Sequence, residues 1–185
     1  MFTKIVDDEI SLKLKEYQDN VEFFQLIDAS RKHLRPFMVW VNSVQSVENV
    51  EEVTQQHLLE FVNKKAMHCL ILYKGKIAGS ISLQDFDWTT RSAEIGYWLG
   101  SDFTGRGIMT RSVSTLLDYA FSELDLHKVE IWAAEENTKS RQIPERLGFT
   151  QEGKRRDNEY INGKYLTMVI YGLLKDEWQQ MKYVF

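Results

Sequence analysis

The segment from Ser92 to Leu124 constrains the fold of this chain more than any other part of it. Residues 92–99 alternate between two faces, as a strand does. The glycine-containing stretch GSDFTGRG follows at residues 100–107, and apolar residues then recur at helical spacing from Met109 to Leu124. We therefore expect a strand, a glycine turn and an amphipathic helix in direct succession.

The glycine turn predicts an anion site at the start of that helix. Gly105 and Gly107 leave the backbone amides uncovered, and the helix dipole adds a favourable potential for a phosphate. A P-loop would need GxxxxGK followed by Ser or Thr, and a dinucleotide fingerprint would need a third glycine where Thr110 stands. ATP and NAD are therefore disfavoured as ligands.

The remaining periodicities predict a mixed α/β chain. Alternating apolar patterns indicate strands at 10–14, 67–73, 76–83 and 128–134, and two more on either side of the Asn162–Gly163 turn. Helical spacing indicates helices over 21–33, from 46 onwards, over 140–147 and over 174–185. Because strands and helices do not alternate strictly, we expect a central mixed sheet with helices on its faces rather than a doubly wound parallel sheet.

Length, charge and composition exclude several classes of protein. The 185 residues predict a single domain over 1–185. With 23 basic and 27 acidic residues and no dense basic run, nucleic acid is not expected as a partner. The longest apolar stretch, Pro36–Val41, is too short to cross a membrane, and the first residues lack a secretory segment, which predicts a cytoplasmic protein. One cysteine, Cys69, and four scattered histidines predict no metal site.

Two ordered motifs make the chain resemble a known family. Glu94–Phe121, EIGYWLGSDFTGRGIMTRSVSTLLDYAF, resembles the acetyl-CoA signature of the GNAT superfamily of N-acetyltransferases, and Asn137–Phe149, NTKSRQIPERLGF, resembles its RimJ/RimL-like group of ribosomal-protein N-terminal acetyltransferases. The resemblance extends over about 11–174. It implies a mostly antiparallel sheet of about seven strands, splayed between the Glu94 strand and the Ile131 strand.

The resemblance also implies acetyl-CoA as co-substrate and a set of residues that bind it. These are Trp98, Leu99, Thr104, Gly105, Arg106, Gly107, Ile108, Met109, Thr110, Asn137, Ser140 and Arg141. Thr104 stands where the family usually has Gln or Arg, and Met109 replaces a small residue. Arg106 is expected either to pair with a CoA phosphate or to be merely solvated, and Asn137 either to hold a carbonyl of the donor or to cap a helix.

Two residues are candidates for catalysis. Glu94 is expected to act as a base, directly or through water, if burial raises its pKa, or else to anchor the amine. Pro144 occupies the position at which many relatives carry a tyrosine, and the resemblance suggests Ser140 as the group that stabilises the leaving sulfur, unless it is only a helix cap. We expect direct transfer without an acyl-enzyme, because nothing near Cys69 in the sequence would activate its thiol.

The acceptor is less constrained. We expect its pocket to use residues of the first two helices and of the strand ends, namely His33, Arg35, Phe37, Trp40, Phe86 and Trp88, while His57 is expected to be a packing residue. A protein N-terminal α-amine demands less activation than lysine, since its pKa of about 7.7–8.0 lies well below about 10.4. A protein N-terminus and a small amine stay open as acceptors, and the rival function is a non-catalytic acyl-CoA-binding module. Trp178, Tyr183 and Phe185 are expected to be exposed aromatics that form a homodimer contact or a satellite core.

Overall fold

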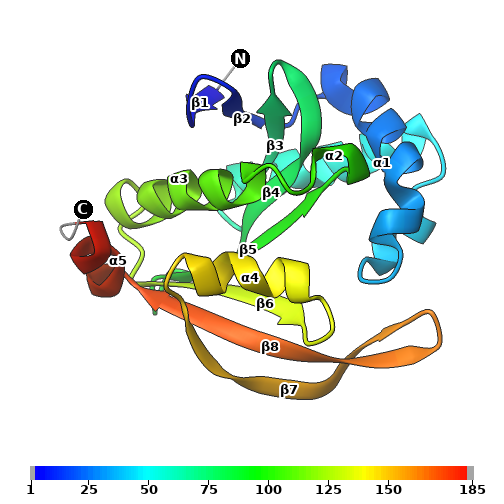
Figure 1. The fold of residues 1–185 in the computed structure, drawn as a ribbon. Coiled ribbons are helices and arrows are strands. Elements are labelled where there is room, and N and C mark those ends of the chain that lie inside the picture. The colour runs from blue at the N-terminus through cyan, green and yellow to red at the C-terminus, as the bar shows by residue number, and fades with distance from the viewer. Residues whose placement is uncertain (1–2, 183–185) are drawn as a thin grey trace.

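The computed structural model describes residues 3–182 as one eight-stranded sheet flanked by helices (Figure 1). The strands are β1 Thr3–Ile5, β2 Ile10–Leu14, β3 Met67–Tyr73, β4 Lys76–Asp87, β5 Ser92–Leu99, β6 Lys128–Ala134, β7 Thr150–Ile161 and β8 Lys164–Leu174. The helices are α1 Asn20–Leu34, α2 Val47–Val62, α3 Ile108–Ser122, α4 Thr138–Arg146 and α5 Lys175–Lys182, and short 3-10 turns cover Tyr17–Asp19, Val39–Asn42 and Ser101–Phe103.

The sheet is antiparallel except at its centre. Its strand order is β1-β2-β3-β4-β5-β6-β8-β7, and only β5 and β6 are parallel neighbours. These two strands pair for three residues, Ser92 to Glu94 against Lys128 to Glu130. Beyond Glu94 they share no ladder, so the sheet opens there and the predicted splay is confirmed.

Helices cover both faces of the sheet, as the alternation in β5 requires. α3 and α4 lie on the face that carries Ile95 and Tyr97, whereas α1 and α2 lie on the face that carries Trp98 (Figure 1). The apolar side of α3 is fully buried against the sheet, with Val113 and Leu117 both 0% exposed. Each such side chain contributes about 1.5–3 kcal/mol by leaving water, and the packing fixes where α3 begins.

Three expectations about elements need correction. The sheet has eight strands rather than about seven. The extra strand, β1, could not be predicted because its three residues are too few to show a period. The helical spacing of Val50, Val53, His57 and Phe61 predicts that these four residues form the packing stripe of α2; the structure buries Val50 and Thr54 but leaves Val53 and Phe61 exposed, so only part of that stripe packs on the sheet. Trp178 is buried rather than exposed, and its Nε1 donates to Asp118 of α3 at 2.8 Å.

The other two C-terminal aromatics, Tyr183 and Phe185, lie outside the described residues. Within residues 3–182, no helix combines the length and the apolar character that crossing a membrane requires.

Candidate active site

The turn between β5 and α3 is shaped by two left-handed glycines. Gly105 has a φ of +75° and Gly107 a φ of +69°, a region that side chains with a Cβ avoid. A Cβ built on either residue would meet nothing within 4 Å, so both face open space. Gly107 is the N-cap of α3, and the first amides of the helix have no acceptor within it. The turn therefore offers uncovered N–H groups to an anion, which fits the diphosphate of CoA.

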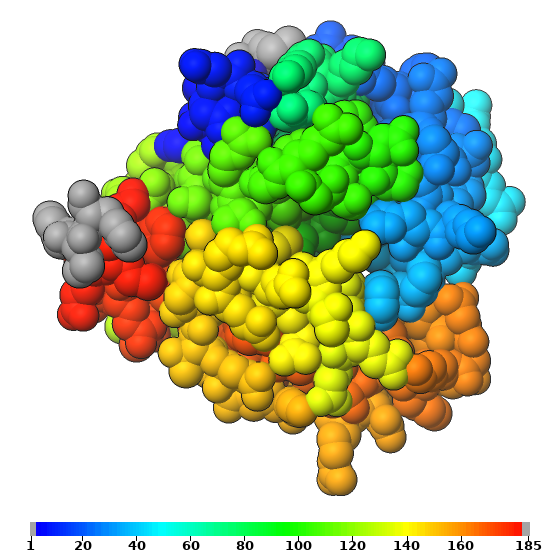
Figure 2. Space-filling view, viewed as in Figure 1, coloured from blue at the N-terminus to red at the C-terminus, as the bar shows by residue number. Residues whose placement is uncertain are grey.

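A cleft of about 710 Å³ lies against this turn. The glycine turn, α4 and the C-terminal end of α1 enclose it, and Figure 2 shows the surface hollowed between the green glycine-turn segment and the yellow α4. Most of the residues predicted to bind the donor line the cleft, namely Trp98, Leu99, Thr104, Gly105, Gly107, Ile108, Met109, Thr110, Asn137 and Ser140.

The two arginines of the predicted set do not line the cleft. The Arg106 guanidinium lies 5.9 Å from the centroid of the Tyr73 ring. The Arg141 Nε donates to the Tyr171 hydroxyl at 2.8 Å, which holds this side chain against the core. Both cations are therefore directed away from the donor cleft.

Two cations that the sequence motifs did not predict line the cleft instead. Lys139 and Arg146 share one face of α4 with Gln142 and Ile143, at spacings of three and four residues. Arg146 also donates to the hydroxyl of Thr110, at 3.2 Å, and so bridges α4 to the start of α3. The helical spacing of the four residues would have identified this face.

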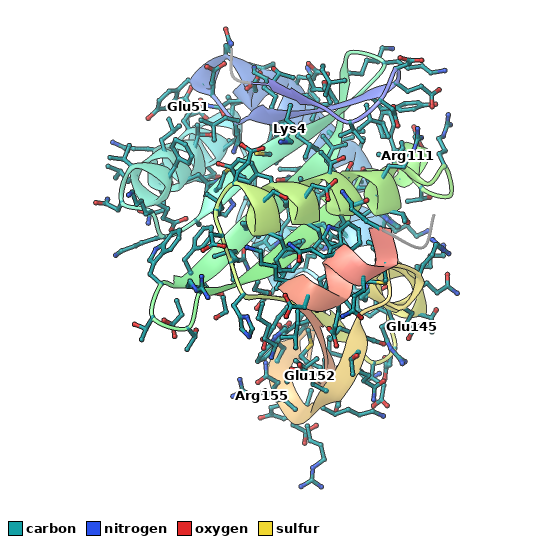
Figure 3. The ribbon with its side chains drawn as sticks, turned by 90° about the vertical axis from the view of Figure 1, so that its left-hand side faces the viewer. Lys4, Glu51, Arg111, Glu145, Glu152 and Arg155 are labelled. Carbon is teal, nitrogen blue, oxygen red and sulfur yellow. The ribbon has the colours of Figure 1, made fainter. Side chains whose placement is uncertain are left out.

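Arg111, one turn into α3, holds the glycine turn in place. Its guanidinium donates to Asp7 at 2.7 Å and to Glu9 at 3.3 Å, and thereby reaches the β1–β2 connection (Figure 3). The same guanidinium donates to the backbone carbonyl of Arg106 at 3.3 Å. The turn is thus tied to a neighbouring segment of the fold, and its amides keep their orientation.

The start of α4 presents Ser140 through a specific set of hydrogen bonds. The Asn137 side chain accepts from the Ser140 amide at 3.2 Å, so Asn137 caps the helix, one of its two expected roles. Pro144 has no N–H to give to the Ser140 carbonyl. The Tyr97 hydroxyl takes that place and donates to this carbonyl at 2.9 Å, while Ser140 Oγ donates to the same hydroxyl at 3.3 Å.

A second cavity, of about 680 Å³, lies on the α1/α2 face and meets the first at the splay. The residues that line both are Phe37, Met38, Tyr97, Trp98, Asn137 and Ser140. Two cavities on opposite faces of the sheet thus share a wall where β5 leaves β6. This arrangement lets a donor enter from one side and an acceptor from the other.

Glu94 lies at the last paired position of β5, directly beside Glu130 of β6. It accepts a hydrogen bond from Gln84 at 3.4 Å, and Gln84 lines the second cavity, although Glu94 itself does not. Burial, reinforced by the charge of Asp85, raises the pKa of the Glu94 carboxyl to about 7. The group is therefore close to half ionised at neutral pH, as a general base requires.

The residues expected to form the acceptor pocket divide into three groups. Phe37 and Trp40 line the second cavity, and the Trp40 ring lies 5.7 Å from that of Trp98. His33 lines the first cavity instead. Arg35, Phe86 and Trp88 line neither cavity; Arg35 donates to Asn42, and the two aromatic rings stack on each other at 4.9 Å.

Cys69 is not a nucleophile in this arrangement. It is 7% exposed, and burial raises the pKa of its thiol to about 12. A thiol in that state carries almost no thiolate at neutral pH.

His57, Glu60 and His68 form the one group of potential metal ligands among the described residues. The two imidazole rings stack at 3.5 Å with an angle of 8° between their planes. The lone pair of an imidazole nitrogen lies in the plane of its ring. Because the two planes are nearly parallel, no ion about 2.0–2.1 Å from both rings can lie in both planes, so the two histidines cannot bind one metal together. The histidines therefore serve as packing and cavity-lining groups, which includes the packing role expected for His57.

Comparison with known proteins gives the family. Residues 12–150 match the acetyltransferase (GNAT) domain family. The chain is 38% identical over 98% of its length to the putative ribosomal N-acetyltransferase YdaF of Bacillus subtilis, all of which is covered.

Two solved structures have the same fold. RimL, the ribosomal L7/L12 α-N-protein acetyltransferase in complex with coenzyme A, has a TM-score of 0.92 at 26% identity, with 95% of this chain and 99% of that chain covered. The microcin C7 self-immunity acetyltransferase MccE, in complex with acetyl-CoA and AMP, has a TM-score of 0.87 at 30% identity, with 91% and 94% covered. The glycine turn, the splayed strands and these matches together lead to one conclusion: this chain belongs to the GNAT family of acetyltransferases.

Proposed function

We propose that this acetyl-CoA-dependent N-acetyltransferase acetylates the α-amino group of a protein N-terminus, in the manner of the ribosomal-protein acetyltransferases to which it is similar. The observation that carries direct transfer is the shared wall of the two cavities at Tyr97, Trp98, Asn137 and Ser140, and the similarity to ribosomal-protein acetyltransferases favours an N-terminal α-amine as the acceptor. A donor in the first cavity and an acceptor in the second would meet there without any covalent relay.

The donor side would be held by the glycine turn and by α4. The amides that follow Gly105 and Gly107 suit the diphosphate, and Lys139 and Arg146 supply positive charge along the same cleft. Acetyl-CoA supplies an activated thioester. The sulfur of that thioester needs a hydrogen-bond donor as it leaves. Ser140 and Tyr97 both have hydroxyls at the junction of the two cavities, and the Ser140 O–H, which donates to Tyr97, would turn towards the sulfur.

The acceptor side would be served by Glu94. The attacking amine must lose a proton, and a carboxyl with a pKa of about 7 accepts one far better than an ordinary glutamate. An α-amine with a pKa of about 7.7–8.0 is partly neutral at that pH, so base and acceptor are matched. Gln84, which donates to Glu94, belongs to the cavity wall, and a water between Glu94 and the amine would carry the proton to the carboxylate.

Release of free CoA thiol tests the proposal. Three kinds of acceptor are compared. The first is a set of peptides that have a free N-terminus and an internal lysine, the second is the same peptides with the N-terminus blocked, and the third is spermidine, a small polyamine. We expect thiol release with the free N-terminus and very little with the blocked peptides. Preferential turnover of spermidine would move the function to small amines, and tight binding of acetyl-CoA without acceptor-dependent thiol release would support the non-catalytic module.

Ser140→Ala separates catalysis from binding in the same assay. The variant should lower kcat and leave the Kd for acetyl-CoA nearly unchanged, because the hydroxyl acts on the sulfur only as charge develops. Thr138→Ala is the matched control, since it removes a neighbouring hydroxyl of the same helix that lines only the first cavity. An unaltered kcat in Ser140→Ala would remove this residue from the mechanism.

A further inference from the structure

The wall of the second cavity carries two buried polar atoms that have no hydrogen-bond partner among the described residues. They are Lys15 Nζ, from the residue after β2, and His57 Nδ1, from α2. Lys15 is only 2% exposed. A buried ammonium without a partner is costly to a folded chain, and such a group at the wall of a cavity points to a ligand that completes it.

The chain itself does not neutralise Lys15. Asp19 and Glu16 both form ion pairs with Lys13, and Asp19 acts on Lys15 only through its charge, which raises the Lys15 pKa against the larger effect of burial. Lys15 Nζ lies 4.4 Å from the centroid of the Phe23 ring, a contact that only partly replaces the lost water. Burial lowers the pKa of Lys15 to about 8, which still leaves the group mostly protonated at pH 7. The cavity therefore holds an unpaired positive charge.

The two histidines beside Lys15 add hydrogen-bond capacity but no charge. Burial lowers the pKa of His57 to about 3, and burial also lowers the pKa of His68 against the opposing effect of Glu60. A neutral imidazole keeps one N–H donor. The Glu60 carboxylate is already in contact with His68 at 3.0 Å, so it is not available to Lys15.

The distance from Lys15 to the splay sets the size of a fitting ligand. Backbone neighbours on successive strands connect Lys15 to the splay. The Lys15 amide donates to the His68 carbonyl of β3, His68 lies opposite Ser82 of β4, and Ser82 lies opposite Gly96 of β5. Three strand spacings of about 4.8 Å separate the first and the last of these residues. The Lys15 side chain rises from the sheet towards α1, where Nζ lies 4.4 Å from the centroid of the Phe23 ring, and that ring lies 5.4 Å from the ring of Trp98 at the splay. Nζ is therefore within about 10 Å of the Trp98 ring, and a hydrogen bond of about 2.8 Å to a carboxylate leaves about 5–8 Å between that carboxylate and an amine beside the ring.

We propose that the acceptor carries a carboxylate about 5–8 Å from its reacting amine, and that Lys15 and His57 bind this carboxylate. The proposal rests on the proposed function and names its substrate class. One ammonium and one neutral N–H match the two oxygens of a carboxylate, whereas a phosphate dianion would find no second cation there. Both an acidic side chain near a peptide N-terminus and a small amino acid carry this chemistry.

Matched acceptors test the proposal. The first pair is two amidated pentapeptides that begin with alanine and differ only in Asp or Asn at the second position; the second pair is γ-aminobutyrate and its amide. The enzymes are wild type, Lys15→Met and Lys32→Met, where Lys32 is an exposed lysine of α1. Methionine keeps the apolar stem on Phe23 and removes an uncompensated charge, so Lys15→Met should fold with an unchanged or higher Tm.

We expect wild type to show a KM at least about tenfold lower for the acidic member of a pair, which corresponds to about 1.4 kcal/mol. Lys15→Met should abolish this difference and Lys32→Met should keep it. The pair that shows the difference identifies the source of the carboxylate. Equal KM values for both members of both pairs in wild type would overturn the proposal while leaving the acetyltransferase function intact.

A binding measurement keeps the inference separate from turnover. Glutarate, an unreactive dicarboxylate, is titrated into wild type and Lys15→Met by calorimetry. Binding that is at least about tenfold weaker in the variant supports the carboxylate site even if no acceptor releases thiol. Equal binding, or none to wild type, contradicts it. Failure of the proposed function appears instead as absent thiol release with every acceptor.

Discussion

Replacing Glu94 with glutamine should stabilise the protein relative to wild type, and this gain in the free energy of unfolding should grow as the pH rises. The Glu94 carboxyl has a pKa of about 7 in the folded chain, against an ordinary value of 4.5, because burial and then the charge of Asp85 disfavour its ionised form. Below 4.5 the carboxyl is protonated in both states and has no effect. Between 4.5 and 7 the unfolded chain ionises first, and stability falls with rising pH until the folded pKa is passed.

The size of the effect follows from the two pKa values. A carboxyl with a pKa of about 7 when folded and 4.5 when unfolded lowers the free energy of unfolding by about 3 kcal/mol once both states are ionised. Screening at a partly accessible site reduces this, so we expect about 1–3 kcal/mol at pH 8. Glutamine is nearly isosteric and neutral, and it can keep a hydrogen bond to Gln84.

Urea unfolding at pH 4.5, 6, 7 and 8 measures the prediction. The free energy of unfolding of Glu94→Gln relative to wild type should start near zero and grow with pH. Glu130→Gln is the matched control: although burial raises the pKa of Glu130, hydrogen bonds from Lys128 and Trp132 outweigh it and hold this pKa below the ordinary value. Its removal should therefore lower stability above the ordinary pKa, the opposite sign. A pH-independent difference for Glu94→Gln would refute the assignment.

The same variant tests the catalytic role of Glu94. With a pKa of about 7, about half of the wild-type enzyme carries an ionised Glu94 at pH 7 and about a tenth at pH 6. kcat should therefore rise about fivefold between these two pH values and then level off. In Glu94→Gln, the rise of kcat between pH 6 and pH 7 should be absent. A variant with a lower kcat but the same rise would assign Glu94 to positioning the amine instead.

Three further variants test other parts of the site. Gly107→Val should weaken CoA binding by at least about tenfold in calorimetry, because the side chain enters the space that the glycine turn leaves for the diphosphate. Gly75→Val is the control, since Gly75 has a similar φ of +79° and open space at a turn outside the cleft, and it should reproduce only the backbone strain. Tyr97→Phe should lower the free energy of unfolding by about 1–2 kcal/mol in urea and also lower kcat, because the Ser140 carbonyl loses its donor. Unchanged stability and kcat would show that this hydrogen bond neither stabilises the fold nor positions Ser140. Cys69→Ala should leave kcat intact, and loss of activity in a folded variant would contradict direct transfer.

Local sequence patterns were sufficient to predict most elements of this fold. The strands predicted over 92–99 and 128–134 match the bounds of β5 and β6, because alternation marks a strand without reference to its neighbours. Left-handed glycines at 105 and 107 were predictable for the same reason, since the turn depends on local backbone geometry. The family followed from two motifs, each contiguous in the sequence.

What only the tertiary structure decided is which side chains share a space. No local pattern shows that Tyr97 would supply the donor that Pro144 lacks, or that Arg106 would lie over Tyr73 while Arg146 lines the cleft. The raised pKa of Glu94 and the unpartnered ammonium of Lys15 arise from burial against segments far away in the chain. Periodicity is a property of a few consecutive residues, whereas desolvation and pairing depend on everything that packs around a group, and so they exist only once the chain has folded.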